Sequence, residues 1–397
     1  MIKQREYNQT EIGRIPKEWK VVKFKDWKDI DLIMGQSPPG KSYNRKGDGL
    51  PFIQGKAEFG YKYPHLTLWT TQPTKIAEEG DILISVRAPV GDVNICPFRL
   101  CIGRGLAAIR IIKDSNIFYF YWFRKEKQRI ENMGKGSTFK AITKNDLFNL
   151  SIPLPPLPEQ QKIAEILSTV DEAIEKVDDS IEKTKRLKKG LMCELLTKGI
   201  GHKEFKDTEI GRIPKEWEVS SLSKIIKLAS GKTRPSEIAD MPSTTMPHPV
   251  YGGNGILGYT NTFIVDKETI VIGRVGEYCG SIHKTLGLAW ITDNALYAVE
   301  IQRGSVELDY LIYSLAFINL NKFKKKSGQP LMTQKIIYSI SIPLPPLAEQ
   351  QKIAEILSTV DKRLELLRSK KEKLERIKKG LMNELLTGQR RVKILES

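Results

Sequence analysis

Two stretches of this sequence have the hydrophobic spacing of long helices. Within 159–198 and again within 349–388, apolar residues recur at alternating steps of four and three positions, the 3.5-residue repeat of a coiled-coil seam. The first seam comprises Ile163, Leu167, Val170, Ile174, Val177 and Ile181, continued by Leu187, Leu191 and Leu195. The second comprises Ile353, Leu357, Val360, Leu364 and Leu367, and Lys371 interrupts it before Leu374. The spacing predicts two helices that pair along narrow apolar faces. Gly190 and Gly380 weaken these helices by ~1 kcal/mol each relative to alanine, so a bend or an end there stays open.

The two helices belong to a sequence that is written twice. EIGRIPKEW at 11–19 returns unchanged at 209–217, and SIPLPPLPEQQKIAEILSTVD at 151–171 returns at 341–361 with a single change, Ala348 in place of Pro158. A third block, LKKGLMCELLT, returns as IKKGLMNELLT near the end of the second helix. Self-similarity on this scale indicates that a whole module is duplicated. The connecting segments are nearly constant, whereas the segments 24–150 and 222–340 between them do not resemble each other in detail.

The dissimilar segments have the composition of mixed α/β domains. Short β-rich runs lie between glycines, and two longer apolar stretches have helical spacing. The predicted strands are Gly80–Val86, Leu106–Ile112, Thr269–Gly273 and Leu296–Ile301, and the predicted helices are Phe118–Arg129 and Leu308–Phe323. The proline-containing runs Ile152–Leu157 and Ile342–Leu347 predict stiff extended struts before each long helix.

The chain's order predicts how the two long helices pair. A helix of 38 residues is roughly 57 Å long, whereas the ten residues Gly199–Thr208 that follow the first helix span at most ~36 Å. The second domain must therefore lie near the far end of the first helix, and the second helix must run back. The predicted fold is α+β: two mixed α/β domains separated by a long antiparallel coiled coil, with a pseudo-two-fold and a near-circular arrangement.

The charge of the chain indicates an anionic partner. Its 397 residues include 64 Lys and Arg against 47 Asp and Glu, a formal charge of +17, with 40% hydrophobic residues. The two helical stretches are nearly neutral, so the excess lies in the domains and connectors. A basic excess of this kind points most often to nucleic acid. The apolar runs are too short for a membrane span, and the sequence shows no secretion signal, so a cytoplasmic location without a membrane partner is expected.

Basic and aromatic residues are interleaved in both dissimilar segments. Such groups can bind phosphates, while Arg, Asn and Gln can reach base edges. The candidate DNA-binding residues of the first segment are Lys41, Tyr43, Arg45, Lys46, Lys56, Tyr61, Lys62, Arg87, Arg104, Lys135, Ser137 and Lys140. Those of the second are Lys232, Arg234, Tyr251, Asn254, Arg274, Tyr278, Lys284, Lys324, Lys325, Lys326 and Gln329.

The sequence offers no catalytic residues and no metal site. Ser230–Thr233 reads SGKT but lacks the glycine that a phosphate-binding loop requires, and the four histidines form no H-E-x-x-H pattern. The four cysteines have neither metal-ligand spacing nor a convincing disulfide pattern. We therefore expect a binding protein with no cofactor of its own.

The doubled SIPLPPLPEQQKIAEILSTVD block and the doubled IGRIPKEW together resemble a specificity (S) subunit of a type I restriction–modification system. The resemblance implies two target-recognition domains that each read one half of a bipartite site in double-stranded DNA. It implies that the repeated helices set the gap between the half-sites and bind two modification (M) subunits, with restriction (R) subunits in the full complex. S-adenosylmethionine and ATP are then used by the partner subunits.

The implied domains follow the repeats. They are a first target-recognition domain at 1–158, a first helix at 159–198, a second target-recognition domain at 199–348 with a linker at 199–208, a second helix at 349–388 and a tail at 389–397. Two alternatives remain at this stage: a coiled-coil scaffold that joins partners without sequence-specific DNA binding, and an unrecognised nuclease or methyltransferase that acts alone.

Overall fold

The computed structural model describes residues 6–134, 141–323 and 330–392. The chain forms two compact units, one of residues 1–177 with 370–397 and one of residues 178–369. Each unit therefore contains one of the dissimilar segments together with parts of both long helices.

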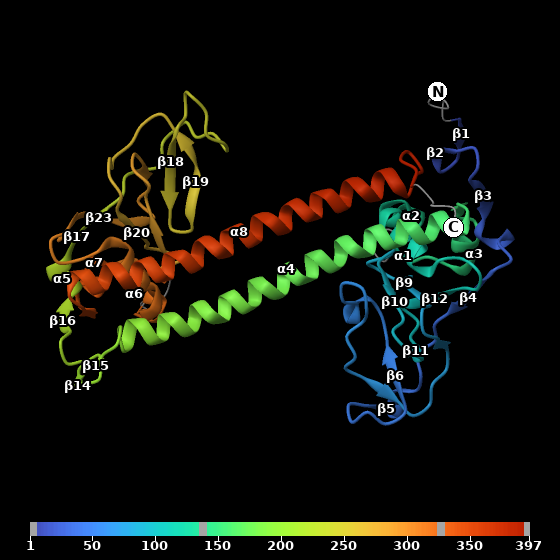
Figure 1. The fold of residues 1–397 in the computed structure, drawn as a ribbon, viewed down its shortest axis with the longest axis horizontal. Coiled ribbons are helices and arrows are strands. Elements are labelled where there is room, and N and C mark those ends of the chain that lie inside the picture. The colour runs from blue at the N-terminus through green and yellow to red at the C-terminus, as the bar shows by residue number, and fades with distance from the viewer. Residues whose placement is uncertain (1–5, 135–140, 324–329, 393–397) are drawn as a thin grey trace. The chain divides into compact units, whose positions relative to one another are not determined.

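The described residues of the first unit form a four-stranded sheet, a five-stranded sheet, two two-stranded ladders and three short helices (Figure 1). Its strands are β1 (Tyr7–Thr10), β2 (Gly13–Pro16), β3 (Lys20–Lys23), β4 (Ile30–Met34), β5 (Tyr43–Asn44), β6 (Leu50–Ile53), β7 (Trp69–Thr70), β8 (Ile76–Ala77), β9 (Ile82–Ser85), β10 (Val93–Ile95), β11 (Leu100–Ile102), β12 (Leu106–Ile111) and β13 (Ser151–Leu154). Its helices are α1 (Asn116–Lys125), α2 (Lys127–Met133), α3 (Lys144–Phe148), the first part of α4 (Leu157–Thr197) and the last part of α8 (Leu347–Leu385). Three 3-10 helices lie at Phe24–Asp26, Gly40–Ser42 and Lys56–Glu58.

The first unit's four-stranded antiparallel sheet has the order β10-β9-β12-β4. Its second sheet has the order β5-β7-β6-β11-β8, in which β6 and β11 run parallel. The strands predicted at Gly80–Val86 and Leu106–Ile112 are confirmed as β9 and β12. The helix predicted at Phe118–Arg129 begins earlier, where the Ser115 side chain accepts a hydrogen bond from Phe118 N, and it is divided at Glu126 into α1 and α2.

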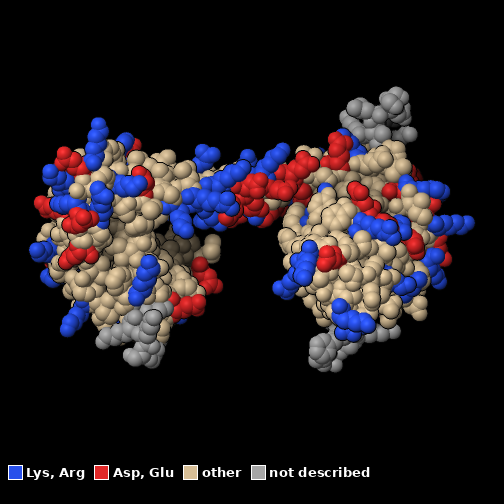
Figure 2. Space-filling model, turned by 90° about the horizontal axis from the view of Figure 1, so that it is seen from below, with Lys and Arg blue, Asp and Glu red and all other residues tan. Residues whose placement is uncertain are grey.

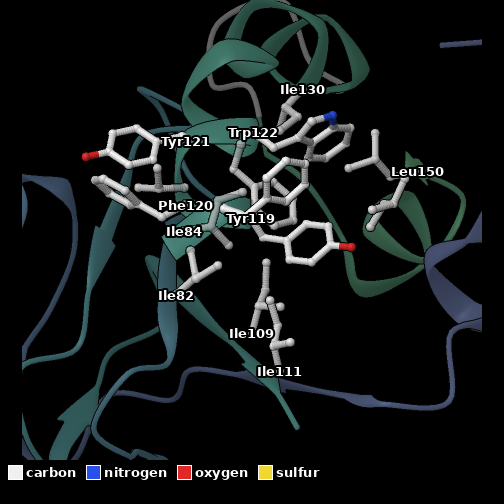
Figure 3. Packing of buried hydrophobic residues seen from close by; sticks show 14 of the residues in the cluster. Ile82, Ile84, Ile109, Ile111, Tyr119, Phe120, Tyr121, Trp122, Ile130 and Leu150 are labelled. Carbon is white, nitrogen blue, oxygen red and sulfur yellow. The ribbon is translucent and has the colours of Figure 1, made fainter. Parts of the chain in front are cut away.

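Helix α1 carries the aromatic core of the first unit. All six residues of the run 118–123, FYFYWF, are buried. Figure 3 shows members of this run above Ile82 and Ile84 of β9 and Ile109 and Ile111 of β12, with Trp122 between Ile130 and Leu150. A helix that is apolar on all sides must be covered on all sides. Here the four-stranded sheet covers one side, and the repeated segments that flank the domain cover the other.

The second unit repeats the order of the four-stranded sheet despite its different sequence, and its other sheet has three strands. Its strands are β14 (Phe205–Thr208), β15 (Gly211–Pro214), β16 (Glu218–Ser221), β17 (Ile226–Ser230), β18 (His248–Gly252), β19 (Gly255–Thr260), β20 (Ile270–Gly273), β21 (Ile282–Lys284), β22 (Trp290–Ile291), β23 (Ala295–Ile301) and β24 (Ser341–Leu344). Its own helices are α5 (Leu222–Ile225), α6 (Leu308–Ile318) and α7 (Gln334–Tyr338), with a 3-10 helix at Leu320–Phe323. The four-stranded order β21-β20-β23-β17 reproduces β10-β9-β12-β4. In the three-stranded sheet, which has the order β19-β18-β22, β18 and β22 are parallel, as are β6 and β11.

The remaining element predictions for the second unit differ only in their ends. The strands predicted at Thr269–Gly273 and Leu296–Ile301 are β20 and β23. The helix predicted at Leu308–Phe323 ends at Ile318, because Asn319 adopts a left-handed conformation with φ of 60°, and a 3-10 turn follows.

The proline-containing struts prove to be strands. β13 pairs antiparallel with β3, and β24 pairs in the same way with β16. Proline has no backbone N–H to donate, so a strand tolerates it at a position that faces away from the paired strand. The two ends of each dissimilar segment are thus joined by a short ladder, and one strand of each ladder, β13 or β24, is the repeated SIPL sequence.

Repeated side chains fix each long helix to its domain. The indole Nε1 of Trp19 donates to Glu159 over 2.9 Å, and that of Trp217 donates to Glu349 over 2.9 Å. Gln160, beside Glu159, accepts from Ser115 N and donates to the Pro155 carbonyl; Gln350 makes the matching bonds in the second unit. The repeated blocks therefore make the same Trp–Glu and Gln–backbone contacts in both units.

The two long helices run antiparallel within the first unit. Glu159, near the start of α4, binds Arg391 just beyond the end of α8. Asp171, three turns further along α4, binds Lys378 of α8, which lies earlier in the sequence than Arg391. In the second unit the pair of Lys188 and Asp361 follows the same antiparallel sense. The predicted antiparallel pairing is confirmed.

The predicted seam is wrong at Leu187, and four of its other members, Val170, Leu191, Leu367 and Leu374, are only half-buried. The seam residues Ile163, Leu167, Ile174, Val177, Ile181, Leu195, Ile353, Leu357, Val360 and Leu364 are buried. Leu187 is 54% exposed, whereas Thr184 is buried, because the steps of three and four continue from Ile181 to Thr184 and Lys188. Neither glycine ends its helix, since α4 continues through Gly190 and α8 through Gly380.

No helix of the described residues is long and apolar enough to cross a bilayer.

Candidate nucleic-acid interface

In the first unit, four backbone segments interlock where the sheets end. Gly35 N donates to Leu106 O over 2.9 Å, Gly103 N donates to Ile53 O over 2.8 Å, and Val86 N donates to Gly105 O over 2.9 Å. A Cβ on Gly35 would overlap the carbonyl of Gly103, so this close approach requires glycine. We call residues 35–37, 54–55, 86–87 and 103–105 the first glycine-lined edge; its exposed polar side chains are Gln36, Gln54, Arg87 and Arg104.

The second unit has a matching edge. Gly231 N donates to Ala295 O over 3.0 Å, and a Cβ on Gly231 would overlap the carbonyl of Thr292. Arg274 N donates to Asn294 O over 2.9 Å. We call residues 230–232, 253–254, 273–275 and 292–294 the second glycine-lined edge; its exposed polar side chains include Ser230, Lys232, Asn254 and Asn294.

The two edges share a backbone and differ in side chains. The bond from Val86 to Gly105 corresponds to the bond from Arg274 to Asn294, because both link the residue after the β9 or β20 strand to the residue before β12 or β23. Arg274 thus occupies the position of Val86, one residue before the equivalent of Arg87. The same scaffold presents different donors and acceptors in the two units.

Arg274 is held in place rather than freely solvated. Its Nη1 donates to Ser230 Oγ over 3.1 Å, and its Nε is buried with no hydrogen-bond partner among the described residues. The bond to Ser230 therefore fixes the Arg274 side chain on the second glycine-lined edge.

Five of the predicted DNA-binding residues lie on the glycine-lined edges. They are Arg87 and Arg104 in the first unit and Lys232, Asn254 and Arg274 in the second. Arg234 lies two residues beyond the edge segment 230–232 and is exposed. Tyr278 lies in the loop after β20 and is 47% exposed. The edges also present Gln36, Gln54, Ser230 and Asn294, which the sequence did not suggest as candidates. For the first three, a signal was present, because each adjoins a glycine at the end of an apolar run.

A second group of predicted residues lies on the β5 turn. The Asn44 side chain closes this turn, since its Oδ1 accepts from Lys46 N and Asp48 N and its Nδ2 donates to Asp48 O. Arg45 and Lys46 are exposed on the turn, with Lys41 on the preceding 3-10 helix. The ring of Tyr43 packs on Phe52 with centroids 5.0 Å apart, and its hydroxyl donates to Pro38 O. Figure 2 shows lysine and arginine scattered among acidic and uncharged residues on the visible face of each unit.

A third group of predicted residues makes ion pairs within the protein. Lys56 and Lys127 both bind Asp92, at 2.8 and 2.6 Å; burial raises the pKa of Asp92, but these hydrogen bonds outweigh burial and lower it. Lys284 binds Asp309 and Glu268 at 2.8 and 3.3 Å. Burial lowers the pKa of Lys284, but the two carboxylates outweigh burial and raise it.

The remaining predicted aromatic and basic residues also have internal contacts. The Tyr251 ring is buried and its hydroxyl donates to Lys284 O, and the Lys62 ammonium lies 5.4 Å from the centroid of the Tyr63 ring. Tyr61 donates to Asp171 of α4 over 2.6 Å. DNA contact by this group stays a prediction. Lys135, Ser137, Lys140, Lys324, Lys325, Lys326 and Gln329 lie outside the described residues.

The edges can serve sequence reading because of their residue types. Arginine can donate two hydrogen bonds to guanine, and asparagine or glutamine can pair with adenine in the major groove. Lysines and arginines nearby can bind phosphates without regard to sequence. Because the glycines add no side-chain bulk, the backbone of the edge can come close to a DNA groove. The side chains beside the glycines can then reach into that groove.

Stability of the second unit should fall in mild acid through His283, which lies on β21. Its Nε2 is buried without a hydrogen-bond partner among the described residues. Burial lowers the pKa of the imidazole below its ordinary value, against the opposing effect of a hydrogen bond that the ring donates to the Gly253 backbone. His283 therefore binds a proton more readily in the unfolded chain than in the folded one. The stabilising contribution of the neutral imidazole is complete above the pKa of the unfolded state and is lost as the pH falls below about 6.5. Local hydrogen exchange in β20 and β21 should therefore increase between pH 7.5 and 5.5.

The matched control for this prediction is His283→Gln, which has no titrating group at the site. It should show a smaller increase over the same pH interval. An equal increase in both proteins would assign the acid sensitivity to other groups.

Comparison with known proteins agrees with this architecture. A family model described as the type I restriction modification DNA specificity domain matches residues 16–183 and 214–376. A putative type I restriction enzyme MjaX specificity subunit of Methanocaldococcus jannaschii is 51% identical over 199 residues, which is 50% of this chain and 47% of that relative. The chain thus spans about half the length of that relative. The MjaVIII specificity subunit of the same organism is 29% identical over 96% of this chain and 95% of its own length.

Solved structures share the fold. The type I restriction–modification S subunit from M. genitalium superposes with a TM-score of 0.67 at 20% identity, covering 92% of this chain and 96% of that one. A chain from a structural study of type I complex assembly and conformational transition superposes with a TM-score of 0.57 at 17% identity, over 95% and 99%. Because the family model matches both repeated modules, the chain belongs to the family of type I restriction–modification DNA specificity subunits.

Proposed function

We propose that this chain reads a bipartite site in double-stranded DNA, with one half-site for each recognition domain. The observation that carries the proposal is the pair of glycine-lined edges: one backbone arrangement, repeated in two units, presents Arg87 and Arg104 in one unit and Lys232, Asn254 and Arg274 in the other. Phosphate contacts would supply affinity, and the few side chains on each edge would supply sequence preference.

The repeated helices would set the spacing of the half-sites and bind two modification subunits. Two nearly identical frames offer the same surface twice, which suits two copies of one partner. In this scheme the chain itself is not catalytic. Methyl transfer from S-adenosylmethionine and ATP-driven cleavage belong to the modification and restriction subunits, and the complex works in the cytoplasm.

The test is an exchange of residues 222–340 for the equivalent segment of another specificity subunit. Both ends of this segment meet the repeated frame, so the graft keeps both joints. Sequencing of methylated motifs, in cells that also produce the modification subunits, should show one half-site changed and the other half-site and the gap unchanged. A change in both half-sites would contradict the assignment of one half-site to each domain.

A further inference from the structure

The helix pair of the first unit contains a buried polar cluster. Asp171 of α4 binds Lys378 of α8 at 2.5 Å, and the two side chains are only 10% and 8% exposed. The carboxylate also accepts hydrogen bonds from the hydroxyls of Tyr61 and Tyr121, at 2.6 and 2.7 Å. Lys378 in turn donates to the Tyr61 hydroxyl over 2.6 Å. A buried cluster of this kind is stable only when all of its members are bonded.

Both tyrosines of this cluster come from the dissimilar segment: Tyr121 lies on α1, whereas Tyr61 lies in the turn that follows the 3-10 helix at Lys56–Glu58. Its hydroxyl accepts from one long helix and donates to the other, and the Arg124 guanidinium lies 4.7 Å from its ring centroid. Burial and the Asp171 carboxylate raise the pKa of Tyr61, so the hydroxyl keeps the proton that it donates.

The backbone that carries Tyr61 is continuous with the first glycine-lined edge. From Gln54 and Gly55 on that edge, the chain passes through the 3-10 helix and reaches a turn in which Gly60 N donates to Tyr63 O over 3.1 Å. Asn94 holds this turn on both sides, because its Oδ1 accepts from Gly60 N and its Nδ2 donates to Gly60 O. A displacement of Tyr61 would therefore be transmitted to the edge.

The second unit has the equivalent ion pair but a different cluster. Asp361 and Lys188 are the repeat equivalents of Asp171 and Lys378, and they are 2.6 Å apart. Their side chains are 38% and 27% exposed, and the carboxylate accepts from Tyr313 of α6. Among the described residues of 223–305, no side chain hydrogen-bonds to this pair.

We propose that Tyr61 is a positioning residue that ties the first glycine-lined edge to the helix pair, so that reading of the first half-site depends on a contact that the second domain lacks. This inference rests on the proposed DNA-reading function. Removing the Tyr61 hydroxyl deletes one donor and one acceptor of the cluster while keeping the ring. The edge would then be held by its backbone bonds alone.

The experiment compares Tyr61→Phe with Tyr313→Phe in the full chain produced together with its modification subunits. Hydrogen exchange followed by mass spectrometry reports the order of residues 54–65 without DNA. Methylation rates on DNA with a substituted first or second half-site report discrimination at each half. For Tyr61→Phe we expect faster exchange in 54–65 and a roughly tenfold loss of discrimination at the first half-site, the equivalent of one lost hydrogen bond to a charged group. Discrimination at the second half-site should stay unchanged.

Tyr313→Phe should leave both the exchange of 54–65 and the first half-site unaltered. The inference is overturned if Tyr61→Phe changes neither readout, or if it weakens both half-sites equally, as a general loss of stability would. A wild-type complex that discriminates neither half-site would instead refute the proposed function, and with it the role of Tyr61 in reading. Faster exchange in Tyr61→Phe would still be measured in that case, so the two failures can be told apart.

Discussion

Replacing Asp171 with alanine should lower the free energy of unfolding of the first unit by about 3–5 kcal/mol, the usual cost of removing one partner from a buried ion pair. The substitution leaves the Lys378 ammonium buried without its counter-ion, and it deprives the hydroxyls of Tyr61 and Tyr121 of their acceptor. The pKa of Lys378 is already lowered by burial and by Arg124, against the opposing effect of Asp171. Without Asp171 the charged form loses the partner that supports it.

The repeat supplies the matched control, Asp361→Ala. Its ion pair is partly solvated, so the expected cost is about 1 kcal/mol, as for exposed pairs. Chemical denaturation of the full chain, followed by hydrogen exchange in each unit, measures both effects. Equal losses for the two variants would mean that burial of the first pair does not determine its contribution.

Replacing Trp217 with alanine should destabilise the second unit by about 3–5 kcal/mol. The indole is fully buried against Leu195, Leu196, Ile353 and Leu357, so its removal leaves a cavity where both long helices meet the domain. It also removes the hydrogen bond to Glu349. Glu349 keeps His202 Nε2 at 2.9 Å and Ile200 N at 2.8 Å, so the carboxylate is not left bare.

Trp217→Phe separates the two contributions, because the phenyl ring fills most of the space but cannot donate to Glu349. We expect a loss of about 1.5–3 kcal/mol for this variant, the range for a hydrogen bond to a charged group. Thermal unfolding with exchange in β15, β16 and the ends of the helices measures the difference. Faster exchange confined to the first unit would contradict the assignment of Trp217 to the second unit's joint.

The frame of this protein could be predicted because its information is local and repeated. The steps of three and four place the seam, and the doubling shows which residues must make the same contacts twice. The prediction at Leu187 is wrong because it takes the next leucine as a seam residue. The regular spacing of three and four residues instead continues through Thr184 and Lys188. Aliphatic character alone does not fix a helix face where a lysine can cover the seam with its methylene chain.

The candidate interface was only partly predictable. The sheet order of the two dissimilar segments depends on pairings such as that of β4 with β12, between residues far apart in the sequence, and short strands carry little signal of their partners. Composition could indicate basic residues but could not tell Arg87 on the edge from Lys284, which is bound to Asp309. Gln36 and Gln54 carry no charge, so only the strand-end geometry identifies them.

The short ladders β3–β13 and β16–β24 have a consequence for growth of the protein. Each clasps the two ends of a loop of more than a hundred residues, and the entropy of closing such a loop rises only with the logarithm of its length, about 0.6 kcal/mol for each doubling. Insertions beyond the clasp therefore cost the rest of the chain very little. The five-stranded sheet of one unit and the three-stranded sheet of the other are consistent with this tolerance. Either domain can gain or lose strands while the ladder that joins its ends stays the same.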